Sequence, residues 1–424
     1  DLPFCALREE GYGMAQGMNK LNEALASLPE VRELLLSLDA GTSPIAVSGL
    51  SSVHRAQLSA AVRQKMQRPL LVVCADENES NRMAGDLHEL LGEEVSLLFA
   101  REWQLRDRVS AAHGWEQQRI GSLCRLAAGD ASVLVATVDA LMQRTLPPAL
   151  LRGAVTEIEV GARFDLAALS RKLVEIGYVR AETVEGVGQF ALRGGILDIY
   201  SPLSAPVRVE FFDDEVDAMG EFDLATQRRT QNVKTLTVLP AAEVLPALSD
   251  GGREKMLERL SRAAQKLEKK AADSPIAQTL RGDIERLSND LPLGGMDRYL
   301  AACYPDEVCA LDYLASDTLA VVSDGMRVLE RGKNYHWELS EDVKPLIEEG
   351  VLCGEFASLA LSQEALSHRL ADFPVLLLDA LPTSRSLLAP RVLLSMNARS
   401  LPSYGGSLET AAGDMERYLG AGCG

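Results

Sequence analysis

The 424-residue chain lacks the features of secreted and membrane proteins. Its seven cysteines are scattered and odd in number and include no CxxC pair, which is typical of reduced thiols rather than of a disulfide framework. It contains no run of about 18 apolar residues, and its start, "DLPFCALREE", lacks the charged-then-apolar pattern of a signal peptide. We therefore expect a cytoplasmic protein with neither disulfides nor a membrane span.

Basic residues are in deficit: 43 lysines and arginines stand against 61 aspartates and glutamates, a formal net charge of −18. The average surface therefore repels phosphate groups, so DNA binding would require a local basic patch. Residues 253–270 are one candidate, because they include seven basic and three acidic residues. A solvated helix face with ion pairs between successive turns explains this composition better.

Motifs for metal and nucleophilic chemistry are also missing. None of the five histidines has HExxH or HxH spacing or lies near a cysteine, and there is no GxSxG nucleophile elbow. The densest acidic group is Asp213, Asp214, Glu215 and Asp217. These carboxylates could hold a divalent metal for phosphodiester cleavage, but the apolar strands on both sides favour a hairpin turn.

The sequence does contain a clear alternation of helices and apolar strands. Up to about residue 154, strand-like runs at 69–75, 95–99 and 132–136 alternate with segments of helical period. The same texture returns after about residue 240, with strands expected at 319–323 and 374–380. Such alternation predicts an α/β fold with a parallel sheet that is covered by helices on both faces.

Residues 155–240 have a different texture. Asp165 is a suitable N-cap for a helix that ends at Gly177, and the strand-like runs "GQFALRG", "GILDIY", "VRVEFF" and "EVDAM" follow. One helix and four short strands predict a small α+β domain dominated by antiparallel sheet. We expect this domain to interrupt an α/β domain formed by residues 1–154 and 241–381. Residues 382–424 are interpreted as a linker and the start of a further, truncated domain of a longer protein.

The stretch "IAVSGLSSVHRA" has the outline of a phosphate-binding loop. A working loop, GxxxxGK[ST], needs glycines around the phosphates, a lysine on the β/γ-phosphates and a hydroxyl group on Mg²⁺. Aligned from Ala46, the second glycine is replaced by Ser51, the lysine by Ser52 and the hydroxyl residue by Val53, and only Gly49 remains. These losses favour a plain strand-to-helix turn capped by Ser51 or Ser52.

The stretch "QFALRGGILDIYSPLSAPVRVEFFDDEVD" contains arginine and aromatic residues that the hydrophobic core does not account for. Strand alternation places Arg193 on the face of its strand that points away from the apolar Phe190 and Leu192. On a later strand, it places Arg208, Glu210 and Phe212 on the face that points away from the core. Arginine and aromatic side chains are enriched among the anchor residues of protein interfaces. The alternative is a solvated strand face on which Arg208 pairs with Glu210 or with an acid on a neighbouring strand.

The segment "GYVRAETVEGVGQFALRGGILDIYSPLSAPVRVEFFDDEVDAMGEFDLATQRR", with the following "VLPAAEVLP", resembles a domain shared by bacterial transcription-repair coupling factors and the excision-nuclease component UvrB. A weaker resemblance covers about residues 20–380 in family order: half of a RecA-like helicase domain, the inserted domain, then the other half. It implies a degenerate helicase-like fold and a function in transcription-coupled nucleotide excision repair.

Residues at the positions of the UvrB motifs distinguish between UvrB and the coupling factors. The acidic second ATPase motif of UvrB would fall on Ser323 and Asp324, followed by Gly325 and Met326, and its third motif on 379–381. The tyrosine-rich hairpin with which UvrB enters damaged DNA would fall on the short stretch "FAREWQLRDRVSAAHGWEQQRIGSL", which has no tyrosine. These losses resemble the N-terminal half of a coupling factor, in which ATP and Mg²⁺ belong to a motor further along. No catalytic residue, metal or cofactor is expected in this chain.

A partner is implied as well. In that family the inserted domain binds the excision-nuclease component UvrA, and the residues carried over are Arg193, Arg208 and Phe212. RNA polymerase and DNA would bind parts of the longer protein that are not present here. The main hypothesis is therefore a non-catalytic adaptor that recruits UvrA to a stalled polymerase. The alternatives are an ATP-dependent helicase or translocase, a UvrB-like protein that binds damaged DNA, and a metal-dependent nuclease.

Overall fold

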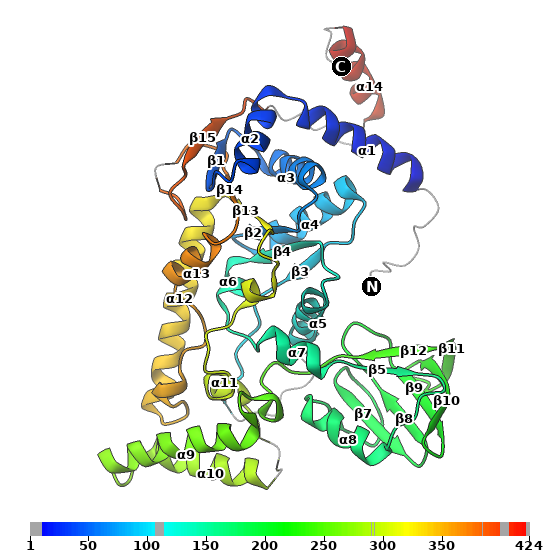
Figure 1. Cartoon of the computed structure of the whole chain (residues 1–424), viewed down its shortest axis with the longest axis vertical. Coiled ribbons are helices and arrows are strands. Elements are labelled where there is room, and N and C mark those ends of the chain that lie inside the picture. The colour runs from blue at the N-terminus through cyan, green and yellow to red at the C-terminus, as the bar shows by residue number, and fades with distance from the viewer. Residues whose placement is uncertain are drawn as a thin grey trace.

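The computed structural model describes residues 11–106, 114–289, 291, 293–383, 385–398 and 407–420. These residues form an α/β domain, an inserted β-rich domain and a helical hairpin (Figure 1). None of the helices in these ranges is long and apolar enough to cross a membrane.

A seven-stranded sheet forms the centre of the α/β domain. Its order is β15-β1-β14-β13-β2-β4-β3, and every adjacent pair is parallel. All residues of β2, β4 and β13 are buried, as expected for strands covered on both faces. The expected fold class and the five strands predicted from apolar runs are confirmed. The strands are β1 (Ile45–Ser48), β2 (Leu70–Cys74), β3 (Ser96–Leu98), β4 (Val133–Thr137), β13 (Leu319–Ser323), β14 (Val375–Leu378) and β15 (Val392–Ser395).

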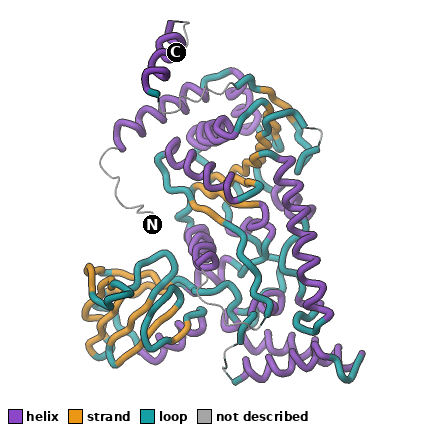
Figure 2. Tube along the Cα trace, turned by 180° about the vertical axis from the view of Figure 1, so that it is seen from behind, coloured by secondary structure: helices purple, strands orange, loops and turns teal. Residues whose placement is uncertain are grey.

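Helices cover both faces of this sheet (Figures 1 and 2). Helices α2, α3 and α4 bury apolar side chains against one face, and α1 contacts α3 and α4. Helices α5, α6, α12 and α13 cover the other face. The helices are α1 (Gly11–Ala26), α2 (Pro29–Asp39), α3 (Ser52–Met66), α4 (Glu77–Leu91), α5 (Gly114–Ala128), α6 (Val138–Met142), α7 (Pro148–Ala154), α11 (Leu300–Cys303), α12 (Gly325–Glu348), α13 (Gln363–Leu370) and α14 (Leu408–Gly420), with short 3₁₀ turns at Pro246–Leu248, Met296–Tyr299, Ala310–Tyr313 and Gly354–Phe356.

The inserted domain consists of a six-stranded sheet, a two-stranded ribbon and one helix. The sheet order is β11-β10-β9-β8-β7-β6, antiparallel except for the pair β6–β7. Helix α8 (Leu166–Glu175) packs on one face, and the Asp165 carboxylate accepts the Ala168 N–H as the predicted N-cap. The strands are β5 (Thr156–Glu159), β6 (Val179–Arg180), β7 (Gln189–Arg193), β8 (Ile196–Ile199), β9 (Val207–Phe212), β10 (Glu215–Phe222), β11 (Arg229–Val233) and β12 (Thr235–Val238).

Edge strands depart from the sequence-based expectation. Strand β15 lies within the stretch interpreted as a linker, yet it pairs with β1 at the edge of the main sheet. Strand β11, "RTQNV", is polar and mostly exposed, so it shows no apolar alternation. An edge strand needs only one hydrogen-bonded neighbour and little buried side-chain surface, which leaves a weak signal in the sequence.

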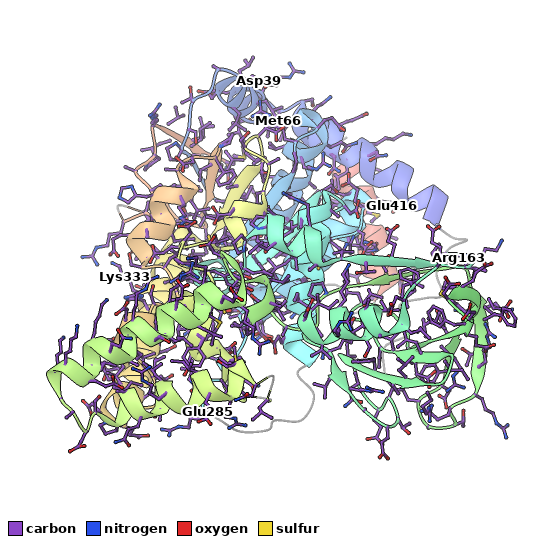
Figure 3. The ribbon with its side chains drawn as sticks, turned by 60° about the horizontal axis from the view of Figure 1, so that its bottom comes forward. Asp39, Met66, Arg163, Glu285, Lys333 and Glu416 are labelled. Carbon is purple, nitrogen blue, oxygen red and sulfur yellow. The ribbon has the colours of Figure 1, made fainter. Side chains whose placement is uncertain are left out.

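Helices α9 (Gly252–Lys270) and α10 (Pro275–Ser288) form the helical hairpin. Both predicted apolar stripes are present, and Met256, Leu260 and Leu280 are buried. Basic residues of α9 form exposed ion pairs with acids, including two within the helix to Glu258, as expected of a solvated face. The inserted domain, labelled at Arg163, and the hairpin, labelled at Glu285, project as separate lobes (Figure 3).

Candidate protein-interaction site

The residues singled out in the sequence lie on one face of the six-stranded sheet, opposite α8. We call it the outer face and define it by Arg193, Ile196, Asp198, Arg208, Glu210 and Phe212. Alternate residues of the same strands, such as Leu197 and Val209, are buried against α8 and the β5–β12 ribbon. The predicted alternation of the two strand faces is therefore confirmed.

A buried carboxylate joins the two arginines of the outer face. Asp198 on β8 is directly opposite Arg208 on β9, and its side chain is only 1 % exposed. Arg208 donates from Nε to Oδ1 (2.6 Å) and from Nη2 to Oδ2 (2.9 Å), while Arg193 Nη2 donates to Oδ2 (2.8 Å). The bidentate contact between the Arg208 guanidinium and the Asp198 carboxylate is among the stronger charge-assisted hydrogen-bond arrangements.

Arg208 is more enclosed than the sequence suggested. Its third hydrogen bond runs from Nη1 to the carbonyl oxygen of Gln227 (3.3 Å), and its guanidinium lies 5.1 Å from the centre of the Phe222 ring. Hydrogen bonding to Asp198 raises its pKa above the usual arginine value. Its side chain is only 21 % exposed. Its acidic partner, Asp198, lies on the neighbouring strand, which is one of the two pairings that the sequence left open for Arg208.

Arg193 and Phe212 are the exposed members of the outer face. The Arg193 side chain is 54 % exposed and makes one hydrogen bond to Asp198. Phe212 is 80 % exposed at the end of β9, next to the two-residue turn at Asp213 and Asp214. Asp213 adopts a φ of +58° there, so Asp213 and Asp214 form the predicted hairpin turn, and Glu215 and Asp217 lie on β10. Within the described residues, no cluster of His, Cys, Asp or Glu suits a metal ion.

The degenerate phosphate-loop region links β1 to α3, as expected. Gly49 has a φ of +90°, and a Cβ there would lie 1.9 Å from the carbonyl oxygen of Met396, so the chain after β15 leaves no room for a side chain. Ser51 is the N-cap residue of α3, and its hydroxyl lies 3.0 Å from His54 Nδ1. Ser52 begins the helix, and Val53 is 52 % exposed.

An internal network of charges occupies the carboxyl edge of the main sheet beside this loop. Glu79, which is 3 % exposed, accepts a hydrogen bond from Ser323 Oγ (2.7 Å) and lies 3.4 Å from guanidinium nitrogens of both Arg55 and Arg327. Asp324 lies 3.7 Å from Arg55 and caps α12. The positions aligned with the second ATPase motif are thus engaged in contacts within the chain.

Comparisons with known proteins agree with the architecture. Residues 156–243 match the family model of the UvrB interaction domain. The transcription-repair-coupling factor of Bacillus subtilis (strain 168) is 26% identical over 407 residues, which are 95% of this chain and 34% of that protein. That of Myxococcus xanthus is 31% identical over 347 residues, 78% of this chain and 28% of that protein. That of Staphylococcus haemolyticus (strain JCSC1435) is 24% identical, covering 89% and 32%.

The chain is a homologue of the transcription-repair-coupling factors over most of its length. It spans about a third of the length of the curated relatives that it matches. The UvrB interaction domain in it begins at β5, contains the whole outer face and ends at Glu243, in the segment that returns to the α/β domain.

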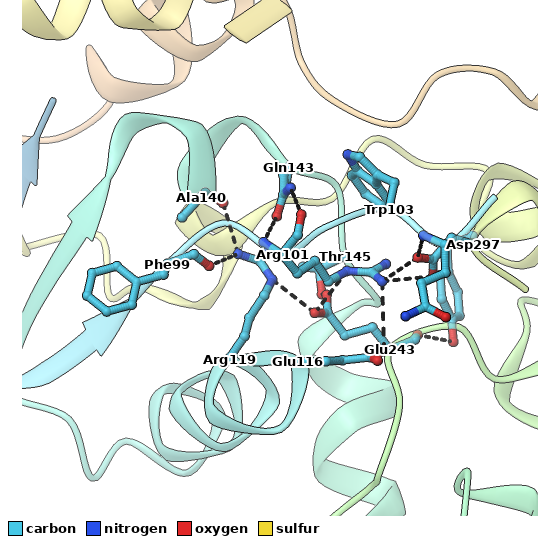
Figure 4. A network of polar contacts seen from close by, with 12 residues as sticks. Phe99, Arg101, Trp103, Glu116, Arg119, Ala140, Gln143, Thr145, Glu243 and Asp297 are labelled. Carbon is cyan, nitrogen blue, oxygen red and sulfur yellow. Dashed lines mark hydrogen bonds and ion pairs between the residues drawn. The ribbon is translucent and has the colours of Figure 1, made fainter. Parts of the chain in front are cut away.

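A buried polar network lies where the UvrB interaction domain rejoins the α/β domain (Figure 4). Arg119 Nε donates to Glu243 (2.9 Å), and Arg101 Nε lies 3.3 Å from the same carboxylate. Arg101 also holds Asp297 at 2.7 Å. Burial disfavours the charged form of Glu243, but the two arginines outweigh burial and hold its pKa below the usual value. We call this group, with Glu116, the junction network.

Several residues of these sites were not singled out in the sequence. Asp198 is one polar residue in the apolar run "GILDIY", and Ile196 is a 40 % exposed apolar residue beside Arg193. Arg229 on β11 pairs with Glu210 (3.2 Å) by crossing Gly220, whose missing side chain leaves space for it. The single acid within an apolar strand was the available signal for Asp198, because such an acid needs a cationic partner.

Proposed function

We propose that this chain is the adaptor region of a transcription-repair-coupling factor, and that it recruits the excision-nuclease component UvrA through the outer face. The observation that carries this proposal is the pair of exposed groups on the outer face: Arg193, which is hydrogen-bonded to the buried Asp198 carboxylate, and Phe212. In the longer protein, this recruitment would take place at stalled RNA polymerase on cytoplasmic DNA, through domains further along the chain.

The outer face suits a protein partner with acidic and apolar groups. Arg193 retains donors that are not used by Asp198, and Phe212 offers an aromatic ring with little cover from its own chain. Exposed aromatic rings and arginines are the residue types that dominate binding energy at interfaces. Ile196, which is opposite Arg193 on β7 and opposite Glu210 on β9, adds exposed apolar surface.

The same proposal assigns no ATP hydrolysis to this chain. Phosphoryl transfer depends on a lysine or arginine clamp and a metal held by hydroxyl and carboxylate groups. Ser52 and Val53 cannot supply the lysine and the metal-binding hydroxyl, and Arg55 is held beside Glu79. ATP and Mg²⁺ would act only in a motor elsewhere in the longer protein.

Titration calorimetry of the chain with purified UvrA, without DNA or ATP, tests the recruitment. Saturable binding is expected, and Phe212→Ala and Arg193→Ala should each weaken it by roughly tenfold or more. Arg171→Ala on the exposed side of α8 and Trp337→Ala on α12 are matched controls that should bind like the unmodified chain. If Phe212→Ala and Arg193→Ala also bound normally, the outer face would not be the docking surface.

ATP turnover separates the adaptor from a helicase or translocase. The purified chain is expected to release no phosphate from ATP in the presence of Mg²⁺ and DNA. Turnover that co-purified with the chain and persisted after Ser52→Ala and Val53→Ala would show an ATP site elsewhere and favour the motor alternative.

A further inference from the structure

The two arginines of the outer face differ in how much of each remains available to a partner. Arg208 places Nε and Nη2 on Asp198 and Nη1 on the Gln227 carbonyl, and its guanidinium lies against the Phe222 ring. Arg193 makes one hydrogen bond to Asp198 and is 54 % exposed, against 21 % for Arg208. The enclosed arginine therefore satisfies the carboxylate, and the exposed one is left partly free.

The geometry points to Arg208 as a positioning residue that acts through Asp198, and to Arg193 as the residue that meets an acidic group of the partner. This inference rests on the proposed function. It differs from a surface on which both arginines bind the partner directly, because it assigns Arg208 no partner contact.

The reason is the charge of Asp198. A carboxylate that is 1 % exposed requires a close cation, and Arg208 supplies one through two hydrogen bonds. Without Arg208, the Asp198 carboxylate would draw Arg193, its other cationic partner, into a closer and more complete ion pair. The outer face would then lose its free donors although Arg193 itself was unchanged.

A pair of compensating variants tests this reasoning. Arg208→Gln should weaken binding to UvrA by at least about tenfold. The double variant Asp198→Asn/Arg208→Gln removes the buried charge together with its cation, and it should restore binding to within about threefold of the unmodified chain. Arg208→Lys, which keeps the positive charge but loses the planar fork, should bind within about fivefold.

A second readout does not depend on the partner. Phenylglyoxal modifies accessible guanidinium groups, and peptide mass spectrometry reports its rate at Arg193. The rate should fall several-fold in Arg208→Gln and return in the double variant. Arg171, on the exposed side of α8, provides an internal reference that should react equally in every variant. Thermal unfolding measurements check that each variant is folded. If Arg208→Gln is not folded, Arg208→Lys is the milder substitution to use.

The two readouts separate the possible failures. If the double variant bound UvrA as weakly as Arg208→Gln, Arg208 would touch the partner itself and the inference would be overturned. An unchanged modification rate at Arg193 in Arg208→Gln would overturn it as well. If the unmodified chain did not bind UvrA at all, the proposed function would fail, and the modification rates would still decide whether Arg208 positions Arg193.

Discussion

Replacing Glu116 by glutamine is expected to stabilise the folded chain at alkaline pH. In the junction network, the guanidinium groups of Arg101 and Arg119 face three carboxylates, those of Glu116, Glu243 and Asp297. The carboxylates of Glu243 and Asp297 lie 2.9 Å and 2.7 Å from an arginine nitrogen, whereas that of Glu116 lies 3.8 Å from Arg101. Burial raises the pKa of Glu116 to about 7, against the attraction of Arg101.

The sign of this stability change follows from the proton on the Glu116 carboxyl group, which the folded chain holds more tightly than the unfolded chain does. The pKa of Glu116 rises from 4.5 to about 7 on folding, so its contribution to stability is full below pH 4.5 and is lost as the pH rises through 7. This shift corresponds to roughly 3 kcal/mol as an upper limit. Because glutamine resembles the protonated acid, Glu116→Gln should gain roughly 1–3 kcal/mol at about pH 8.

Urea unfolding at about pH 5 and about pH 8 measures this gain. The gain is expected to be several-fold smaller at about pH 5, where the folded chain already holds the proton. Glu254→Gln, at an exposed glutamate of α9, is the control and should follow the unmodified chain at both values. A Glu116→Gln variant that was less stable at about pH 8, or whose gain did not depend on pH, would refute the reasoning.

Three further predictions concern the loop, the junction network and the nucleotide. Gly49→Ala should destabilise the chain by roughly 3 kcal/mol or more in urea unfolding, because of the positive φ and the contact with the carbonyl of Met396. Gly153→Ala, where a Cβ would meet nothing within 4 Å, is its control and should be close to neutral. Glu243→Gln should cost roughly 3–5 kcal/mol in the same assay, because two buried arginines lose their shared carboxylate. Millimolar ATP with Mg²⁺ should leave the thermal unfolding temperature unchanged; a rise would reveal nucleotide binding.

The elements of this fold were largely predictable because their signals are local. Strand β2 is a run of five buried apolar residues, and α8 has its N-cap at Asp165 and its stop at Gly177. Alternation along β9 assigned Phe212 to the exposed face without knowledge of its neighbours. Such features depend on residues a few positions apart in the chain.

The enclosure of Arg208 was not predictable to the same extent. Alternation placed it on the outer face, but its burial depends on the register that sets Asp198 opposite it and on the loop that brings the Gln227 carbonyl within reach. The alternative of a cross-strand acid was open in the sequence. Only the pairing of β8 with β9 identified which acid it was.

The sequence by itself determined most of the helices and strands, the two faces of β7 and β9, and the loss of the groups that a phosphate-binding loop needs. Tertiary structure alone decided that β15 joins the sheet beside β1 and that Arg101 meets Asp297, a residue 196 positions away. The physical reason is that a buried ion pair or an edge strand is stabilised by groups that folding brings together from distant segments, and the local pattern of neither segment contains that information.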